Sequence, residues 1–325
     1  MIVLTHDNVR NLLPMKDAIE VMDHAMRGVS DGKAQLPLRS AVPVGDGNLM
    51  GVMPGAIADP PCFGVKLVSL FAENPARGLS SHRGAIVLFE AETGGAIAMM
   101  DASLLTAIRT AAASGVATRA LAQKDAKILT IIGNGEQAKH HLEAMLSVRD
   151  LAKVRIVGRS ADNVSAFCEA AKACHPTLSI SGGTDAQSAV ADAEIICTVT
   201  AAKAPILHGD WIAPGTHVNI VGSSVPTMRE VDDRMVERAS VWVDYLPSTL
   251  AQAGEIVDMI AAGRFDANEI KGEIGACLAG NAPGRGTTQE ITAYRSLGVA
   301  AQDLATARFV YDRAKDLGVG QIVSF

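Results

Sequence analysis

The sequence predicts an α/β fold, in which a doubly wound parallel sheet follows an α+β region at the N-terminus. From Ile128 onward, short apolar stretches alternate with stretches of helical periodicity, as in parallel sheets whose strands are joined by helices. Before that point, strand-like segments follow one another with turn signals between them, which is typical of antiparallel pairing. The apolar segment at residues 321–325 has no evident place in the parallel sheet, so we expect it to return to the first region.

Residues 1–127 are expected to form a helix, a run of strands and a second helix. Pro14 opens a stretch with apolar residues at helical spacing, and Gly32 ends it. Asp101 is the expected N-cap of an alanine-rich helix that runs to about residue 123. Strands are expected at residues 2–4, 38–42, 49–53, 63–71, 85–91 and 96–100, the last two joined by a turn at Thr93-Gly94-Gly95.

The region after residue 127 is expected to supply the parallel sheet. A chain of 325 residues usually forms two domains, which agrees with this division. Buried strands are expected at residues 128–132, 154–157, 178–180, 195–199, 218–221 and 241–243, and helices at residues 136–147, 161–174, 246–262 and 301–317.

Composition and charge exclude several classes of protein. The formal net charge is −6 and no basic block occurs, which argues against nucleic-acid binding. The 5 cysteines form no CxxC pair, which indicates reduced thiols and no metal site. The N-terminus lacks the pattern of a signal peptide, and no apolar run is long enough to span a membrane. We therefore expect a soluble, cytoplasmic protein.

The first strand of the parallel sheet runs directly into Gly133-Asn134-Gly135-Glu136-Gln137-Ala138 and then into a helix. Gly133 permits a tight turn, Gly135 lets the backbone approach a pyrophosphate, and Ala138 lets the helix pack closely on the strand. The N-terminus of the helix presents partial positive charge to phosphates. This context predicts a Rossmann-type dinucleotide site; the alternative is a turn with a purely structural role.

The end of the second strand indicates which dinucleotide is preferred. An NAD(H) site usually has a carboxylate here, bound to the ribose 2′-hydroxyl. This chain instead has Val157-Gly158-Arg159-Ser160. A guanidinium and a hydroxyl suit a 2′-phosphate, so we expect NADPH to be preferred. If Arg159 is only a solvated surface residue, NADH is accepted as well.

The sequence resembles the ornithine cyclodeaminase/μ-crystallin family over essentially its whole length. The resemblance rests on Gly64-Val65-Lys66, on residues 105–112 (LTAIRTAA), on the glycine turn and on Arg295-Ser296-Leu297-Gly298. It implies a cofactor domain of residues 114–298 and a discontinuous α+β domain, residues 1–113 and 299–325, for substrate binding and dimerisation. It also implies a homodimer that acts on a small α-amino or α-imino acid.

Three basic residues acquire roles through this resemblance. Arg39, Lys66 and Arg109 correspond to the residues that hold the substrate carboxylate, and Lys66 is expected to be catalytic as well. Charge-assisted, bidentate hydrogen bonds suit a carboxylate, and an unpaired ammonium in an apolar strand would be costly. The alternative is that each cation forms a structural ion pair. Asp303 in the C-terminal helix either caps that helix or orients one of the cations.

Further residues correspond to groups near the cofactor. Ser81 and His82 resemble the serine–histidine pair of the μ-crystallin branch, with His82 catalytic and Ser81 in contact with the cofactor. The other expected cofactor contacts are Thr110, Gly133, Asn134, Gly135, Glu136, Gln137, Arg159, Ser160, Thr198, Thr200 and Val221.

One motif departs from the cyclodeaminase pattern. After the fifth strand, cyclodeaminases have an aspartate that acts as general base, and Ser224 occupies that place here. Glu230 and Asp232 come too late in the sequence to replace it. Oxidation of an amine followed by cyclisation and loss of ammonia needs such a base. Reduction of a protonated cyclic imine needs only a carboxylate clamp, an aligned hydride donor and a group such as Ser224 near the imine nitrogen.

We therefore expect NADPH-dependent reduction of Δ1-pyrroline-2-carboxylate or Δ1-piperideine-2-carboxylate to L-proline or L-pipecolate. Alanine dehydrogenase activity is the nearest alternative, followed by ornithine cyclodeaminase activity. A non-catalytic, crystallin-like protein that binds NADPH or a metabolite is a further alternative. The presence of Arg39, Lys66 and Arg109 together favours catalysis, because nucleotide binding alone would not need them.

Overall fold

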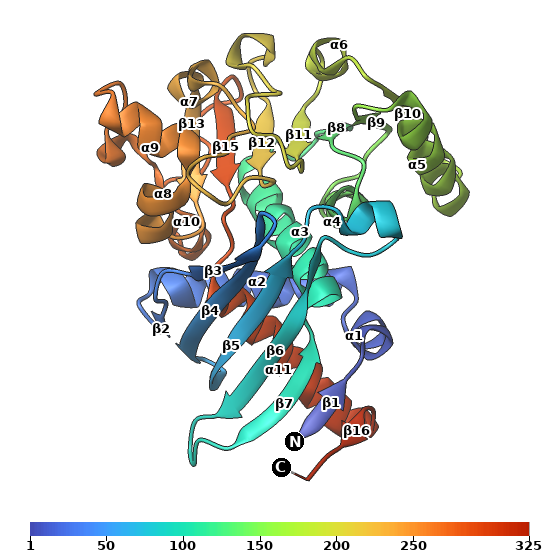
Figure 1. The fold of residues 1–325 in the computed structure, drawn as a ribbon. Helices are drawn as coiled ribbons and strands as arrows, with labels where there is room; N and C mark the ends of the chain where they lie inside the picture. The colour runs from blue at the N-terminus through green and yellow to red at the C-terminus, as the bar shows by residue number, and fades with distance from the viewer. Residues whose placement is uncertain (325) are drawn as a thin grey trace. The chain divides into compact units, whose positions relative to one another are not determined.

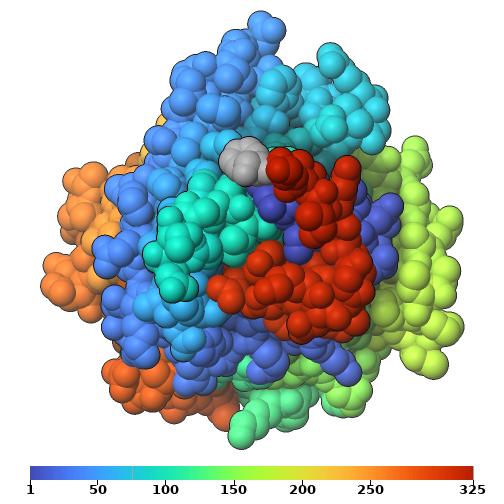
Figure 2. Space-filling model, turned by 90° about the horizontal axis from the view of Figure 1, so that it is seen from below, coloured from blue at the N-terminus to red at the C-terminus, as the bar shows by residue number. Residues whose placement is uncertain are grey.

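The structure, a computed structural model, describes residues 1–324 and forms two compact units. Unit 1 comprises Met1–Ala112 and the C-terminal segment that begins at Val299, and unit 2 comprises Ala113–Gly298. The two segments of unit 1 meet where β16 (Gln321–Ile322) pairs antiparallel with β1 (Ile2–Leu4). Figure 2 shows the red C-terminal residues directly beside dark blue N-terminal ones. The expected terminal strand is thus present in shorter form, and residue 325 lies outside the described residues.

Unit 1 contains a mixed sheet of eight strands with the order β16-β1-β7-β6-β5-β4-β2, and β3 pairs with β4 (Figure 1). The remaining strands of this sheet are β2 (Ala34–Gln35), β3 (Ser40–Gly45), β4 (Asn48–Ala58), β5 (Pro61–Leu70), β6 (His82–Glu90) and β7 (Ala96–Asp101). A short 3-10 helix, η1 (Asn74–Arg77), precedes β6. All neighbours pair antiparallel except β1 and β7, which are parallel.

Helices cover one face of this sheet. The helices of unit 1 are α1 (His6–Leu12), α2 (Met15–Ser30), the first half of α3 (Ala102–Leu121) and α11 (Ala300–Leu317). Helix α11 packs against β4, β5, β6 and α2. Asp101 accepts a hydrogen bond of 2.9 Å from the backbone N–H of Leu104, so it caps α3 as expected.

Several elements of unit 1 differ from the sequence prediction. Helix α1 was not predicted, because seven residues are too few to show an apolar period; a capping box of Thr5 and Asn8 starts it. Strand β4 continues past the expected end at residue 53, because Pro54 and Gly55 remain paired with β5 through Ala58. Strand β3 begins two residues later than expected, at Ser40.

Unit 2 is a doubly wound parallel sheet, which confirms the predicted fold class. The strand order is β10-β9-β8-β11-β12-β15-β13-β14, and every neighbouring pair is parallel. The chain proceeds outward from β8 to β10 and then returns to place β11 on the other side of β8. The strands are β8 (Ile128–Ile132), β9 (Lys153–Val157), β10 (Ser179–Gly183), β11 (Ile195–Thr198), β12 (His217–Ile220), β13 (Ala239–Val243), β14 (Gly272–Glu273) and β15 (Ile291–Arg295).

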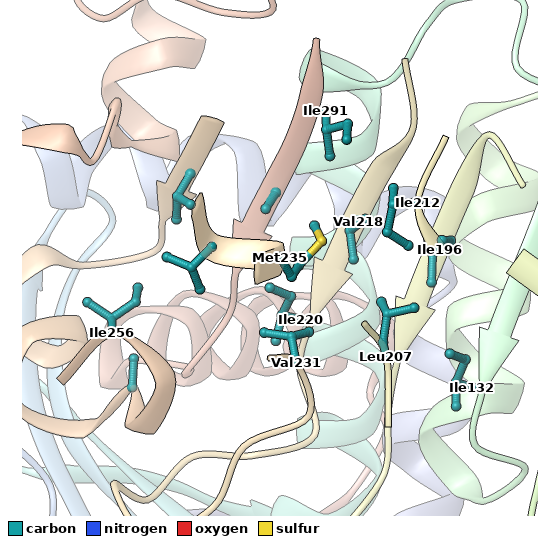
Figure 3. Close-up of a cluster of buried hydrophobic side chains, with 14 of the residues drawn as sticks. Ile132, Ile196, Leu207, Ile212, Val218, Ile220, Val231, Met235, Ile256 and Ile291 are labelled. Atoms are coloured by element: carbon teal, nitrogen blue, oxygen red, sulfur yellow. The ribbon is translucent and has the colours of Figure 1, made fainter. Parts of the chain in front are cut away.

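Helices connect most of these strands. They are α4 (Glu136–Val148), α5 (Ala161–Cys174), α6 (Ala186–Val190), α7 (Asp233–Arg238), α8 (Leu246–Gln252), α9 (Gly254–Ala261) and α10 (Ile274–Ala279), with short 3-10 turns η2 (Gly209–Trp211) and η3 (Ala267–Glu269). The apolar core of unit 2 gathers side chains from several strands and from the helices packed on them (Figure 3). Ile196 and Ile220 come from β11 and β12, and Met235 comes from α7. This core fixes the strand ends where the candidate site lies.

Several features of unit 2 differ from the prediction. The expected helix at residues 246–262 is split into α8 and α9 at Ala253. The chain at Gly254 lies so close to the loop before it that an added Cβ would be 2.6 Å from the carbonyl oxygens of Pro226 and Met228. Strand β15 was not predicted, and its last residue, Arg295, is a fully buried arginine.

Candidate active site

A buried ionic cluster lies in unit 1. The ammonium of Lys66, on β5, is 2.8 Å from Oδ2 of Asp303, in the first turn of α11. The guanidinium of Arg109, on α3, donates through Nε to Oδ1 of the same carboxylate at 2.9 Å. Exposure is 3% for Lys66, 4% for Arg109 and 0% for Asp303, so the cluster is shielded from water. The structure thus brings together two of the three predicted carboxylate-binding residues, and Asp303 orients both.

Two glycines explain how α11 comes close enough to the sheet. On β5, a Cβ at Gly64 would be 2.9 Å from Cδ2 of Leu304, the neighbour of Asp303. On β4, a Cβ at Gly55 would be 2.9 Å from the Cβ of Ala300. Alternation along β5 turns Lys66 to the same face as Gly64. The motif Gly64-Val65-Lys66 therefore both makes room for α11 and aims the lysine at it.

Gln302 is a part of the cluster that the sequence did not indicate. Its Oε1 accepts a hydrogen bond of 2.7 Å from Nη1 of Arg109, and its side chain is completely buried. With Asp303 on Nε, Gln302 fixes the plane of the Arg109 guanidinium. The only available signal was the position of Gln302 beside Asp303 in a helix that contains many small residues.

The electrostatics of the cluster leave an excess of positive charge. Burial lowers the pKa of the Lys66 ammonium to about 7; Asp303 opposes this shift, and the charges of Arg109 and Arg39 add to it. Burial alone would raise the pKa of the Asp303 carboxyl, but Arg109 and Lys66 outweigh burial and lower it. One carboxylate therefore faces two buried cations, with the half-buried Arg39 close enough to act on Lys66. Such a site suits a second carboxylate.

The other predicted residues of unit 1 lie at the start of β6 and on α3. Oγ of Ser81 and Nδ1 of His82 are 2.9 Å apart, so these two residues form a hydrogen-bonded pair. His82 is exposed and Ser81 is half-buried. Thr110 follows Arg109 on α3 and is 9% exposed. Their expected contacts with a cofactor stay predictions.

The glycine turn in unit 2 has the geometry that the sequence predicted. Gly133 has a φ of 122°, and an added Cβ would be 2.8 Å from the carbonyl oxygen of Val199, so only glycine fits there. Gly135 is the N-cap of α4 and provides no side chain to cap it. Ala138 is fully buried against the sheet. The turn places the N-terminus of α4 at the carboxyl end of β8.

The residues of this turn fit a dinucleotide. A Cβ at Gly135 would meet nothing within 4 Å, so the backbone there is open to a ligand. Oε1 of Gln137 is buried and lacks a hydrogen-bond partner among residues 1–324. The backbone of Asn134 and Glu136 lies in the same turn, on either side of Gly135. An uncapped helix N-terminus with an orphaned amide oxygen suits a phosphorylated ligand with hydrogen-bond donors.

Arg159 and Ser160 follow the carboxyl end of β9, the strand next to β8. Both are exposed, and the structure shows no ion-pair partner for Arg159 within residues 1–324. Ser160 caps α5, because its Oγ accepts a hydrogen bond from the backbone N–H of Asn163 at 3.4 Å. The hydroxyl proton of Ser160 stays available to a phosphate oxygen.

At the carboxyl end of β11, Thr198 and Thr200 bind a residue that the sequence did not indicate as their partner. Oγ1 of Thr198 donates to Oε2 of Glu230 at 2.8 Å, and Oγ1 of Thr200 donates to Oε1 at 2.7 Å. Thr198 is fully buried, and Val221, after β12, is 8% exposed. The hydroxyls of Thr198 and Thr200, which were expected to contact the cofactor, thus donate hydrogen bonds to the carboxylate of Glu230.

Arg295 fixes the loop that carries Ser224 through hydrogen bonds to the preceding residue. The guanidinium of Arg295 donates to the carbonyl oxygen of Ser223 at 2.8 Å and to its Oγ at 2.9 Å. It also forms an ion pair of 2.5 Å with Glu255. Ser224 itself is half-buried. Arg295, which in the sequence is notable only as part of the motif at residues 295–298, therefore fixes the backbone beside Ser224.

Other classes of site receive no support from the described residues. Residues 1–324 contain no group of three or more His, Cys, Asp or Glu side chains that could hold a metal ion. The five cysteines are free thiols in this part of the chain. Among the described helices, none combines the length and apolar character needed to cross a bilayer.

The chain is similar over its whole length to known reductases and dehydrogenases. A Δ1-pyrroline-2-carboxylate reductase of Bacillus cereus is 34% identical over 329 residues, with 100% of both chains covered. The structure of the Thermococcus litoralis Δ1-pyrroline-2-carboxylate reductase with NADH and L-proline has a TM-score of 0.95 and 35% identity, covering 99% of this chain and 100% of that one. An archaeal alanine dehydrogenase dimer with bound NAD has a TM-score of 0.93 and 30% identity, covering 100% and 99%.

The doubly wound sheet, the glycine turn and the buried cationic cluster define a class of protein, the nicotinamide-dependent oxidoreductases that act on small acids. The family model of the ornithine cyclodeaminase/mu-crystallin family matches residues 1–318. The chain belongs to that family.

Proposed function

We propose that this protein reduces a cyclic imino acid, Δ1-pyrroline-2-carboxylate or its six-membered homologue Δ1-piperideine-2-carboxylate, to L-proline or L-pipecolate. The observation that carries the proposal is the buried cluster of Lys66, Arg109 and Asp303, in which two cations share one carboxylate. A substrate carboxylate supplies the missing negative charge. The Bacillus cereus and Thermococcus litoralis relatives, both named Δ1-pyrroline-2-carboxylate reductases, support this choice of substrate.

Each residue then has a distinct task. Arg109, held in its plane by Asp303 and Gln302, binds the substrate carboxylate, with Lys66 and Arg39 adding charge. Ser224 hydrogen-bonds the imine nitrogen or a water molecule beside it. Ser81 and His82 act at the nicotinamide end of the cofactor, where Ser81 contacts the cofactor and His82 transfers a proton. A bound reduced nicotinamide dinucleotide supplies the hydride.

The carboxylates of unit 2 argue against cyclodeamination. Glu230 is the acidic residue that follows Ser224 most closely, and it accepts four hydrogen bonds from Thr198, Thr200 and Gly222. A carboxylate whose two oxygens are each bound twice has little capacity left to act as a general base. With Ser224 in the place of the aspartate, the loop lacks the base that ornithine cyclisation needs.

We propose further that NADPH is preferred over NADH. Arg159 is exposed after β9, and residues 158–160 include no carboxylate that would bind a free ribose 2′-hydroxyl. The guanidinium of Arg159 and the hydroxyl of Ser160 suit a 2′-phosphate. The relatives described above hold NADH or NAD, so the proposed preference rests on Arg159 and Ser160 of this chain alone.

A substrate panel with both cofactors tests the proposal. Purified protein is mixed with NADPH or NADH and with each cyclic imino acid, or with pyruvate plus ammonia, and oxidation of the cofactor is followed by absorbance. We expect the cyclic imino acids to be the better substrates, and kcat/KM to be about tenfold higher with NADPH, the effect of one charge-assisted hydrogen bond.

Arg159→Ala provides the matched control. It should remove the NADPH preference and leave the rate with NADH unchanged. Faster reduction with pyruvate and ammonia would instead identify an alanine dehydrogenase. Tight NADPH binding without turnover of any substrate would identify a binding protein and contradict the proposal.

A further inference from the structure

Glu230 is a buried carboxylate without a cationic partner among its hydrogen-bond donors in residues 1–324. Oε1 accepts from the backbone N–H and the Oγ1 of Thr200, both at 2.7 Å. Oε2 accepts from Oγ1 of Thr198 at 2.8 Å and from the backbone N–H of Gly222 at 2.6 Å. Its exposure is 0%. Burial raises the pKa of this carboxyl, and the four hydrogen bonds partly offset that effect.

These bonds join chain segments that are distant in sequence. Thr198 and Thr200 end β11 and begin the loop after it, whereas Gly222 follows β12. The backbone carbonyl of Glu230 also accepts from the N–H groups of Ile206 and Leu207, at 2.8 and 3.1 Å. One residue therefore fixes the ends of two neighbouring parallel strands and the return of the loop between them.

The carboxyl ends of β11 and β12, which Glu230 holds together, lie beside the glycine turn that follows β8. A Cβ at Gly133 would be 2.8 Å from the carbonyl oxygen of Val199, which lies between the two threonines. A Cβ at Gly222 would be 2.0 Å from the carbonyl oxygen of Thr200, so these two loops also touch. In doubly wound sheets, ligands bind outside the carboxyl ends of the strands at the point where the strand order reverses, which here is between β8 and β11.

The hydrogen-bond pattern requires a carboxylate and not an amide. All four partners donate to Glu230, and an ionised carboxylate has only acceptor sites. A glutamine would turn its NH₂ group toward one backbone N–H and one threonine hydroxyl. The hydroxyl can rotate to accept from it, but the backbone N–H would lose its acceptor, while the volume of the side chain stays nearly unchanged. Glu230→Gln therefore tests the hydrogen bonds of Glu230 without changing the packing around it.

We propose that Glu230 is a positioning residue for the nicotinamide half of the dinucleotide. It holds Thr198, Thr200 and Gly222 at the separation that the nicotinamide and its ribose need, whereas the glycine turn holds the pyrophosphate and the end of β9 holds the adenine ribose. This inference rests on the proposed function only in taking the ligand to be a nicotinamide dinucleotide.

The test compares two ligands that differ in the nicotinamide half. Dissociation constants of NADPH and of 2′-phospho-ADP-ribose, which lacks nicotinamide, are measured by calorimetry for wild type and Glu230→Gln. We expect the dissociation constant of NADPH to rise about tenfold or more, the effect of unpaired buried donors, while that of 2′-phospho-ADP-ribose stays within about twofold. Equal weakening of both ligands, or no change in either, overturns the proposal.

Asp232→Asn is the matched control. Asp232 lies two residues away and undergoes the same change of charge, but its carboxylate binds His208 and the N–H groups of Gly209 and Met235. This variant should leave both dissociation constants unchanged, and a selective loss of NADPH affinity in it counts against the proposal.

If Glu230→Gln does not fold, as judged by circular dichroism, Thr198→Val carries the test. Valine keeps the shape of the side chain and removes one bond to Glu230. A smaller shift that is still selective for NADPH supports the proposal, and an unselective shift overturns it. These measurements need no substrate, so a failure of the proposed imine reduction leaves their result intact.

Discussion

At the scale of residues, the main feature is the unequal charge of the buried cluster in unit 1. Lys66 and Arg109 share Asp303, and Arg39 adds a positive charge that acts on Lys66. Because burial and the charges of Arg109 and Arg39 outweigh the opposing effect of Asp303, the pKa of Lys66 falls to about 7. In the free protein the ammonium therefore loses its proton as the pH rises through about 7, and a bound carboxylate opposes this loss.

This titration predicts a pH dependence of ligand binding. Below pH 7 Lys66 is protonated and attracts a carboxylate; above that pH it becomes neutral in the free protein and the attraction is lost. The affinity for pyrrole-2-carboxylate, whose ring nitrogen does not titrate in this range, should fall as pH rises above about 7, by up to about tenfold per pH unit. Calorimetry between pH 6 and 9, roughly the range around this pKa, measures it.

Lys66→Arg is the control for this prediction, because a guanidinium stays charged throughout. Its affinity for pyrrole-2-carboxylate should show no inflection near pH 7, and NADPH binding should be unchanged in both proteins. An inflection that persists in Lys66→Arg would assign the titration to another group.

The sequence predicted these cations and could not predict their partners. Lys66 and Arg109 were expected from the family resemblance, supported by the apolar stretches around them, and for Asp303 orientation of a cation was one of two roles left open. Gln302 and Glu230 were missed as partners, because a neutral amide or a lone carboxylate near a strand end carries no pattern in sequence. Their roles depend on which segments the fold brings together, such as Thr198 with Glu230.

At the scale of elements, the sheet of unit 1 has one face that the helices leave open. Most residues paired across this face are apolar: Leu67 lies opposite Val52, and Val87 lies opposite both Val65 and Met99. The rings of Phe63 and Phe89 stack on it with centroids 5.2 Å apart. Contiguous exposed apolar patches mark sites of protein–protein contact. We propose that a second copy of the chain covers this face, in line with the dimeric archaeal relative.

A charge placed in the middle of this face should separate the copies. Leu67, on β5, is 36% exposed there, and Leu67→Glu would bury an unpaired carboxylate in the interface. We expect light scattering coupled to gel filtration to give twice the chain mass for wild type and the mass of one chain for the variant.

Leu250→Glu serves as the comparison, because Leu250 is 39% exposed but belongs to α8 in unit 2. This variant should remain a dimer. A monomeric wild type, or a Leu67→Glu variant that stays dimeric, would contradict the proposed interface.

The elements with strong local signals were the ones predicted. The strand–turn–helix of β8, Gly133 and α4 was expected with its bounds nearly as observed. Strand β15 was missed because it ends in Arg295, whose charge is compensated by Glu255 from another element. The break between α8 and α9 was missed because it follows from the close approach of Gly254 to the loop at residues 226–228.

At the scale of the whole molecule, the proposed substrate and cofactor residues lie in different compact units. Unit 1 holds the residues proposed to bind the imino acid, and unit 2 holds those proposed to bind the dinucleotide. We expected such a division, with bounds at residues 113 and 299, from the terminal strand and from the resemblance; the two units observed are Met1–Ala112 with the C-terminal segment, and Ala113–Gly298. Substrate binding and dimerisation by unit 1 remain proposals.

The central claim is that hydride passes from the nicotinamide to the C=N carbon of a cyclic imino acid. The most direct measurement uses NADPH deuterated at the transferring position of the nicotinamide, with Δ1-pyrroline-2-carboxylate as substrate and the product analysed by mass spectrometry, NMR and chiral chromatography. We predict L-proline that carries one deuterium at its α-carbon. Failure to form proline, or L-proline without deuterium at the α-carbon, would contradict the proposed function.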